Sequence, residues 1–262
     1  MKHSFLDKYA YQDTAIHRLD GRVKVAVMAA LIVAAATTPA GAGWTLAAYA
    51  LLEVLVLSFA RVPLSYVAVR CLTVLPFVLV AAASAPFLRG GDVVWSRTML
   101  GLDVRVTEHG LAVAGNVIAR ACVSLVALIA LVSVTPMERL LESLRRLKAP
   151  ALLVMLAGFA YRYIFLLVDE AERVKMARDS RSFGHQGMLW HARVLGRMLG
   201  SLMVRSFERA ERVYGAMLAR GYEGATARMP AARLSDADVG FLAVGLVLVA
   251  FLRSSPLWLQ HL

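Results

Sequence analysis

Hydrophobic residues gather into six long runs, which shorter polar stretches separate. A helix that crosses a membrane needs about 20 apolar residues, with about 17 as the usual lower limit, and most of the runs approach that length. Pro and Gly mark several of their ends because neither residue continues a helix cheaply. The pattern predicts an all-α membrane protein. The six runs are Val23–Thr38, Trp44–Ala60, Cys71–Leu88, Gly110–Thr135, Ala151–Val168 and Val239–Leu252.

The positions of Lys and Arg predict which side of the membrane each connection faces, since cytoplasmic flanks carry the excess of these residues. The segment before the first run is basic and the turn at 39–43 has no Lys or Arg, so we expect the N-terminus inside. The connection from Arg89 to His109 balances Arg against acidic residues and is expected outside. Residues 137–235 hold 17 of the 29 Lys and Arg against nine acids, which predicts a cytoplasmic block.

The run Ala151–Val168 is apolar enough to cross the membrane, but the charges around it argue against a crossing. A crossing would place the following basic stretch outside and Arg162 near the middle of the bilayer, at a cost of several kcal/mol. We therefore predict a helix that lies along the membrane surface or on a partner subunit. Five spans remain, and the chain divides into residues 1–136 with four spans, 137–235 as a cytoplasmic coupling segment, and 236–262 with the last span.

Residues 189–220 predict one long amphipathic helix. Apolar or small residues recur at three- and four-residue steps along one stripe, and Arg residues occupy the opposite side. A helix of this length reaches about 48 Å at 1.5 Å per residue, which indicates a lever or docking surface, with a solvated face on a packed helix as the alternative. The stripe consists of Leu195, Leu199, Leu202, Ser206, Ala210, Val213 and Met217.

Two predicted helix ends inside the basic block share one local pattern of small residue, Arg, small residue and aromatic. The first is Ser180-Arg181-Ser182-Phe183, and the second, 39 residues later, is Ala219-Arg220-Gly221-Tyr222. Each end taken singly fits a C-cap, in which Gly221 adopts the left-handed conformation and the Arg meets the negative end of the helix dipole. The repetition indicates two similar docking points for two copies of one partner.

Composition agrees with a membrane protein. Hydrophobic residues make up 59% of the chain and the net charge is +11, whereas ordinary soluble domains are about 45–50% apolar. Cys71 and Cys122 fall inside apolar runs, so we expect two small buried side chains. The segment Met1–Asp20 lacks an apolar stretch that ends in a cleavage site, so we expect no signal peptide to be removed.

The N-terminal residues resemble a known family. His3 to Ala10, and especially His17-Arg18-Leu19-Asp20-Gly21-Arg22-Val23-Lys24, resemble the start of the transmembrane (T) component of energy-coupling factor transporters, in particular the CbiQ type. Asp20, Arg22 and Lys24 carry this motif. The family has Ala-Arg-Gly signatures at the ends of two cytoplasmic coupling helices. Ala219-Arg220-Gly221 matches the second in full, whereas Ser180-Arg181-Ser182 keeps only the Arg and the following aromatic.

The resemblance implies an L-shaped, all-α protein of the cell (inner or plasma) membrane, with about five transmembrane helices and a cytoplasmic coupling domain of long amphipathic helices. Such a protein couples ATP hydrolysis in two attached ATPase subunits to movement of a small substrate-binding membrane subunit of the CbiM type, and an additional small membrane subunit fits the same family. Cobalt or nickel is the implied cargo, and a vitamin or another micronutrient is the alternative. The implied ATPase-docking residues are Ser180, Arg181, Ser182, Ala219, Arg220 and Gly221.

Other function classes lack support in the sequence. There is no G-x-x-x-x-G-K-[ST] loop, so we predict a non-enzymatic chain without cofactor, and ATP and Mg²⁺ on partner subunits. The six His are dispersed, which predicts no metal site. Anionic lipid headgroups explain the basic charge better than nucleic acid does, because the basic stretch has no interleaved aromatics. The spans show neither the internal repeats of a stand-alone permease nor convergent catalytic groups.

Two charged residues fall inside predicted spans, Glu53 in the second and Arg120 in the fourth. Unpaired charge in hydrocarbon is expensive, so each side chain should face protein or an opposite charge. We predict either a Glu53–Arg120 ion pair or contacts with the substrate-binding subunit, and the sequence leaves both open.

Overall fold

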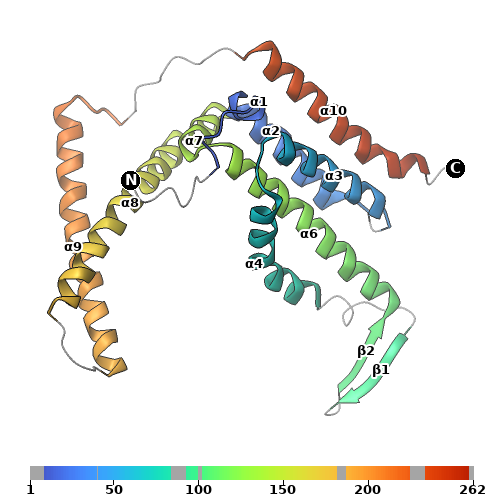
Figure 1. Ribbon diagram of the computed structural model, residues 1–262, viewed down its shortest axis with the longest axis horizontal. Helices are drawn as coiled ribbons and strands as arrows, with labels where there is room; N and C mark the ends of the chain where they lie inside the picture. Colours follow the sequence, from blue (N-terminus) through green and yellow to red (C-terminus); the bar gives the residue numbers. More distant parts are fainter. Residues whose placement is uncertain are drawn as a thin grey trace. The chain divides into compact units, whose positions relative to one another are not determined.

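The computed structural model describes residues 9–39, 41–83, 93–99, 102–181, 187–224 and 234–259. Within these ranges the regular structure is helical except for one hairpin (Figure 1), which confirms the predicted all-α membrane protein. The elements are α1 (Ala15–Arg18), α2 (Gly21–Thr37), α3 (Gly43–Phe59), α4 (Leu64–Ala83), β1 (Val93–Met99), β2 (Leu102–Thr107), α6 (Glu108–Val134), α7 (Met137–Arg146), α8 (Ala151–Asp179), α9 (Met188–Ala219) and α10 (Asp236–Leu259).

The five predicted spans correspond to α2, α3, α4, α6 and α10. Helix α4 begins at Leu64, earlier than the predicted Cys71, because the whole stretch after Pro63 is compatible with a helix. In the described chain, length and composition allow α4, Gly110–Val134 of α6, α8, and Asp236–Ser254 of α10 to cross a membrane. Helices α2 and α3 are each 17 residues long, at the lower limit for a span.

Helix α8 combines the predicted apolar run with the charged stretch that follows it. Its apolar window has a mean hydropathy of 2.1, so length and composition alone would allow a crossing. The helix continues without interruption to Asp179, well past the end of the apolar run at Val168. That α8 does not cross the membrane therefore rests on the positions of the charges, and it stays a prediction.

The connection between α4 and α6 contains an antiparallel hairpin, which the sequence analysis does not predict. Strand β1 pairs with β2 so that Ser96 lies opposite Arg105 and Met99 opposite Leu102. The alternation of apolar and polar residues along Leu102–Thr107 has the two-residue period of a strand and could have revealed it. Strand β2 runs directly into α6 (Figure 1), where the Thr107 hydroxyl accepts a hydrogen bond from the Gly110 amide at 3.2 Å.

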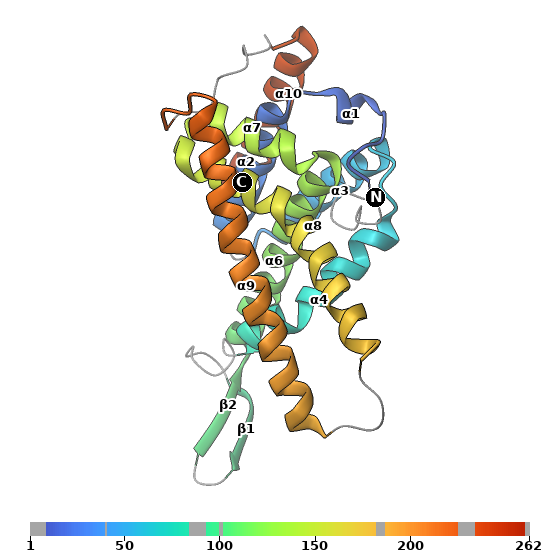
Figure 2. The same cartoon turned by 90° about the vertical axis from the view of Figure 1, so that its left-hand side faces the viewer.

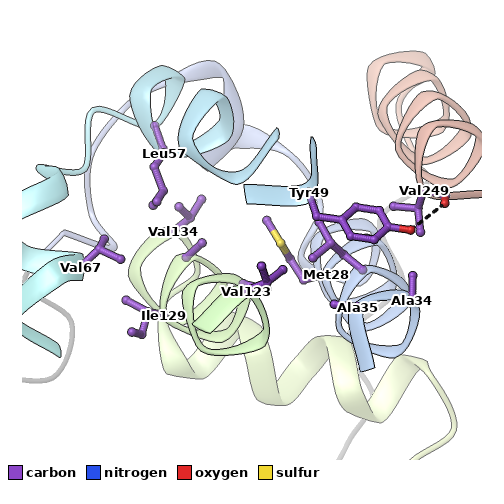
Figure 3. Close-up of a cluster of buried hydrophobic side chains, with 14 of the residues drawn as sticks. Met28, Ala34, Ala35, Tyr49, Leu57, Val67, Val123, Ile129, Val134 and Val249 are labelled. Atoms are coloured by element: carbon purple, nitrogen blue, oxygen red, sulfur yellow. Dashed lines mark hydrogen bonds between the residues drawn. The ribbon is translucent and has the colours of Figure 1, made fainter. Parts of the chain in front are cut away.

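The described chain forms two compact units, which we treat separately. The first contains the helices up to Ser143 together with α10, and the second begins at Leu144 and contains α8 and α9. Side chains from α2, α3 and α6 meet in the core of the first unit, among them Met28, Tyr49 and Val123 (Figure 3). The Tyr49 hydroxyl donates to the Val249 carbonyl at 3.4 Å, which joins α3 to α10.

The sidedness of α8 can be tested with single cysteines in a variant that lacks Cys71 and Cys122. We expect Gly187→Cys, directly before α9, to resist a membrane-impermeant thiol reagent in intact cells, because the basic block should lie inside. Arg97→Cys in the hairpin should be labelled and serves as the control. Labelling of Gly187→Cys from outside would show that α8 crosses the membrane.

Candidate functional site

Helices α8 and α9 lie side by side and run in opposite directions (Figure 2). The Tyr222 hydroxyl, just after α9, donates to Met155 Sδ near the start of α8 at 3.3 Å. Further along α8, Glu170 forms an ion pair with Arg205 of α9. An apolar groove of about 400 Å³ lies between the helices, and its lining includes Phe159, Tyr163, Leu167, Ala210, Val213 and Met217.

Only part of the predicted apolar stripe on α9 faces this groove. Ser206, Ala210, Val213 and Met217 line it, as expected for one face of a helix. Leu195 and Leu199, in contrast, are 52% and 59% exposed. The stripe is therefore covered by α8 only along the C-terminal half of α9, and the rest of it remains available for another surface.

The first predicted docking end follows the last residue of α8. Ser180 keeps a right-handed helical conformation, and both its amide and its hydroxyl donate to the Met176 carbonyl, at 3.0 and 2.9 Å. The Arg181 amide donates to the Arg178 carbonyl at 2.9 Å, and the Arg181 residue is exposed. Ser182 and Phe183 of the motif lie outside the described residues.

The second docking end closes α9 with a Schellman motif. Gly221 has φ of +78°, a left-handed conformation that glycine adopts without a Cβ penalty. The Gly221 amide donates to the Leu218 carbonyl at 3.0 Å, and the Tyr222 amide donates to the Met217 carbonyl at 3.1 Å. Backbone amides thus satisfy the carbonyls at the end of α9, and the cap does not need the exposed Arg220 side chain.

Arg181 and Arg220 lie at opposite ends of the α8–α9 pair. Tyr222 contacts Met155, whereas Arg181 comes 26 residues after Met155 in the chain, which is about 39 Å along a helix that rises 1.5 Å per residue. Among the described residues, neither guanidinium has a hydrogen bond or an ion pair, unlike the neighbouring Arg178, which pairs with Asp179. The structure thus presents two separate, unengaged arginines.

The structure does not bring Glu53 and Arg120 together, so the predicted ion pair is wrong. Arg120 of α6 instead donates to the Ala36 carbonyl at 3.3 Å and to the Thr38 carbonyl. These carbonyls end α2, where the last turn of a helix leaves acceptors unsatisfied and carries the negative end of the dipole. Arg120 is therefore a C-terminal cap for α2.

Glu53 of α3 is buried, with an exposed fraction of 1%. Neither carboxyl oxygen has a hydrogen-bond partner among the described residues. The side chain lines a cavity of about 100 Å³ between α2, α3 and α10, together with Val27, Leu31, Val56, Phe241 and Leu248. Since unpaired buried polar groups destabilise a fold, Glu53 reduces the stability of the first unit.

No group of three or more His, Cys, Asp or Glu side chains in the described ranges could hold a metal ion.

These features define a class, a multi-pass helical membrane protein with a pair of long helices, each followed by an exposed arginine. The chain belongs to the CbiQ family, described as cobalt transport protein, whose sequence profile matches residues 12–231. The predicted family membership is confirmed.

Several relatives are similar over most of the chain. The cobalt transport protein CbiQ of Rhodobacter capsulatus is 30% identical over 190 residues, which are 72% of this chain and 73% of that protein. The energy-coupling factor transporter transmembrane protein EcfT of Bacillus selenitireducens is 30% identical over 239 residues, 85% of each chain. An uncharacterized protein of Methanocaldococcus jannaschii is 28% identical over 57% of this chain, and the match spans 51% of that relative.

The first prediction from the buried charges concerns Arg120→Met, which keeps a side chain of similar reach but removes the donors. We expect the purified protein to lose about 1–3 kcal/mol of unfolding free energy, because the carbonyls that end α2 lose their donors. Denaturant titration in detergent measures this loss. Arg18→Met removes only an exposed ion pair with Asp13 and should change stability by less than about 1 kcal/mol. Equal effects of the two substitutions would contradict the capping role.

The second prediction concerns Glu53→Leu, an apolar substitution of similar size. Replacing an unpaired buried polar group in this way should raise the unfolding free energy by about 1–3 kcal/mol. Glu53→Gln, which keeps the shape but leaves a buried polar group, should gain less. The same titration separates the variants, and a Leu variant less stable than the Gln variant would show that Glu53 has a partner that stabilises it.

Proposed function

We propose that this chain is the T component of an energy-coupling factor importer. In this role it is a non-catalytic subunit that transmits ATP hydrolysis in two partner ATPase subunits to a small substrate-binding membrane subunit. The single observation that carries the proposal is the pair of exposed arginines, Arg181 and Arg220, at the two ends of the α8–α9 pair. Membership of the CbiQ family supports it.

Each arginine side chain can serve as an anchor that binds in a groove of a partner subunit. A guanidinium offers five donors in a rigid planar fork that matches carboxylates and carbonyls, a geometry that Lys does not reproduce. The Schellman motif fixes the backbone at Arg220 through bonds of Gly221 and Tyr222, so the side chain itself stays available. A spacing of about 39 Å along α8 leaves room for two separate proteins. In the proposal, ATP and Mg²⁺ bind to these ATPases on the cytoplasmic side.

The substrate-binding membrane subunit needs a different kind of surface. Helix α9 carries large apolar side chains at four-residue steps on a face outside the groove with α8. An exposed apolar stripe of this kind marks an interaction surface with protein or membrane. This exposed stripe consists of Leu195, Leu199, Met203 and Phe207, each at least 52% exposed. We assign it to the membrane subunit.

For the cargo we propose cobalt or nickel, bound by ligands of the substrate-binding subunit. The family description and the name of the Rhodobacter capsulatus relative both refer to cobalt transport. A vitamin or another micronutrient is the second candidate, because other relatives are named only as energy-coupling factor transmembrane proteins. Uptake of radioactive cobalt by cells that express the whole transporter, with nickel as competitor, decides between these cargoes.

The docking proposal predicts a graded loss of assembly in Arg181→Ala, Arg220→Ala and the double variant. Truncation of an interface anchor costs about 2 kcal/mol or more of association, so each variant should retain fewer ATPase subunits, with Arg220→Ala affected at least as strongly as Arg181→Ala. The measurement is ATPase copurification and cargo uptake at matched membrane levels.

Arg197→Ala is the matched control, because it removes an exposed Arg from the charged side of α9 far from either end. It should leave copurification and uptake unchanged. Wild-type uptake in the Arg181→Ala, Arg220→Ala double variant would mean that the two motifs are helix caps without a docking role.

A further inference from the structure

The N-terminal family motif forms a network of hydrogen bonds at the start of α2. Asp20 caps this helix, since its carboxylate accepts from the Arg22 amide at 2.9 Å and from the Arg22 guanidinium at 3.1 Å. Lys24, 4% exposed, donates from Nζ to the His17 carbonyl at 3.1 Å. All three predicted motif residues therefore hold the segment that leads into α2.

His17 fixes the chain that precedes the motif. Its Nε2 donates to the Tyr9 carbonyl at 3.1 Å, so Nδ1 of a neutral ring accepts from the Thr14 hydroxyl at 2.7 Å. Burial lowers the pKa of His17, which agrees with a neutral imidazole. Residues 9–24 are thus tied to one another before any contact with a distant helix.

Asp238 joins this segment to the start of α10. One carboxylate oxygen accepts from the Asp20 amide at 2.8 Å, and the other accepts from the Ser235 amide at 2.9 Å. The second bond belongs to a capping box, in which an acidic side chain in the first helical turn bonds back to the amide of the N-cap residue. A single side chain, 7% exposed, therefore connects the starts of α2 and α10.

Gly21 brings the same segment against α7. A Cβ at Gly21 would lie 2.2 Å from Ser143 Oγ and 3.4 Å from the Arg139 carbonyl oxygen. Ser143 is 3% exposed, and its hydroxyl donates to the Arg139 carbonyl at 2.7 Å. A side chain at Gly21 therefore requires the Ser143 hydroxyl to leave its hydrogen bond to the Arg139 carbonyl, or the end of α7 to move.

These two contacts lie where the chain passes between its two compact units. The chain leaves the first unit after Ser143 and belongs to it again by Leu234, just before Ser235 and Asp238. Gly21 packs against Ser143, where the chain leaves the first unit, and the Asp20 amide binds the Asp238 carboxylate, where the chain returns. Neighbouring residues of the motif thus contact the last residue of the first unit before the exit, Ser143, and a residue just after the return, Asp238.

We infer that Asp20, Gly21, Ser143 and Asp238 form an anchor, which we call the N-terminal junction. This anchor makes movement of the coupling helices α8 and α9 act on the membrane helices. The four residues are then positioning residues for energy coupling, a role that rests on the proposed function. If either connection gave way, movement of α8 and α9 would be absorbed there, and ATP hydrolysis would continue without transport.

The test uses the complete transporter reconstituted in liposomes. In Gly21→Ala the new Cβ meets Ser143 Oγ, so we expect the amount of cargo imported per ATP hydrolysed to fall by roughly tenfold, near the lower end of typical couplings between sites. The ATPase subunits should remain bound. Ser143→Ala removes the clashing oxygen, and the double variant should recover most of the wild-type ratio.

Gly43→Ala is the matched control, because Gly43 is likewise the first residue of its helix, and nothing lies within 4 Å of a Cβ placed there. It should leave the ratio unchanged. The inference is overturned if Gly21→Ala matches Gly43→Ala, if Ser143→Ala does not rescue it, or if Gly21→Ala loses its ATPases. Failure of the wild-type chain to bind any ATPase would instead contradict the proposed function.

A second readout does not depend on transport. In Asp238→Asn the side-chain nitrogen replaces one of the two acceptor oxygens, so hydrogen exchange at one of the two amides, that of Asp20 or that of Ser235, should speed up by about tenfold or more in the purified chain. Asp236→Asn, two residues earlier in the same helical turn, should have little effect. Unchanged protection in Asp238→Asn would show that Asp238 does not hold the two segments together.

Discussion

The first amides and the last carbonyls of a helix have no partner within the helix, so side chains or solvent must satisfy them. Three distant side chains meet this requirement in the first unit. Asp20 caps the start of α2, Arg120 caps its end, and Asp238 binds amides at the starts of α2 and α10. The contacts of Arg120 and Asp238 also join separate elements, so these two side chains both satisfy polar groups and hold helices together. Several buried polar atoms remain without a hydrogen-bond partner among the described residues, and both carboxyl oxygens of Glu53 are among them.

In the second unit, in contrast, several exposed side chains have no partner among the described residues. Its helices α8 and α9 contact each other through one apolar groove and a Glu170–Arg205 ion pair, while two arginines and an apolar stripe remain without partners among the described residues. An exposed apolar stripe of this kind indicates that the second unit binds another protein or the membrane. A subunit that binds ATPases through its arginines and a membrane protein through its stripe accounts for both features.

The sequence predicted the features that depend on a local pattern, but it did not predict contacts between residues far apart in the chain. Periodicity predicted the helices, and Gly221 predicted the cap of α9, because both signals lie within a few residues. The hairpin was missed although Leu102–Thr107 alternates. Arg120 was paired with Glu53 because charge alone cannot show that the end of α2 lies beside α6. The contact between Asp20 and Asp238 joins residues 218 positions apart, and no local signal indicates it.

We propose that one copy of this chain joins two ATPases to one substrate-binding membrane subunit. Native mass spectrometry of the complex purified through a tag on this chain measures that composition most directly. We expect two ATPase subunits and at least one small membrane subunit per chain. A chain that purifies alone, or only with copies of itself, would contradict it.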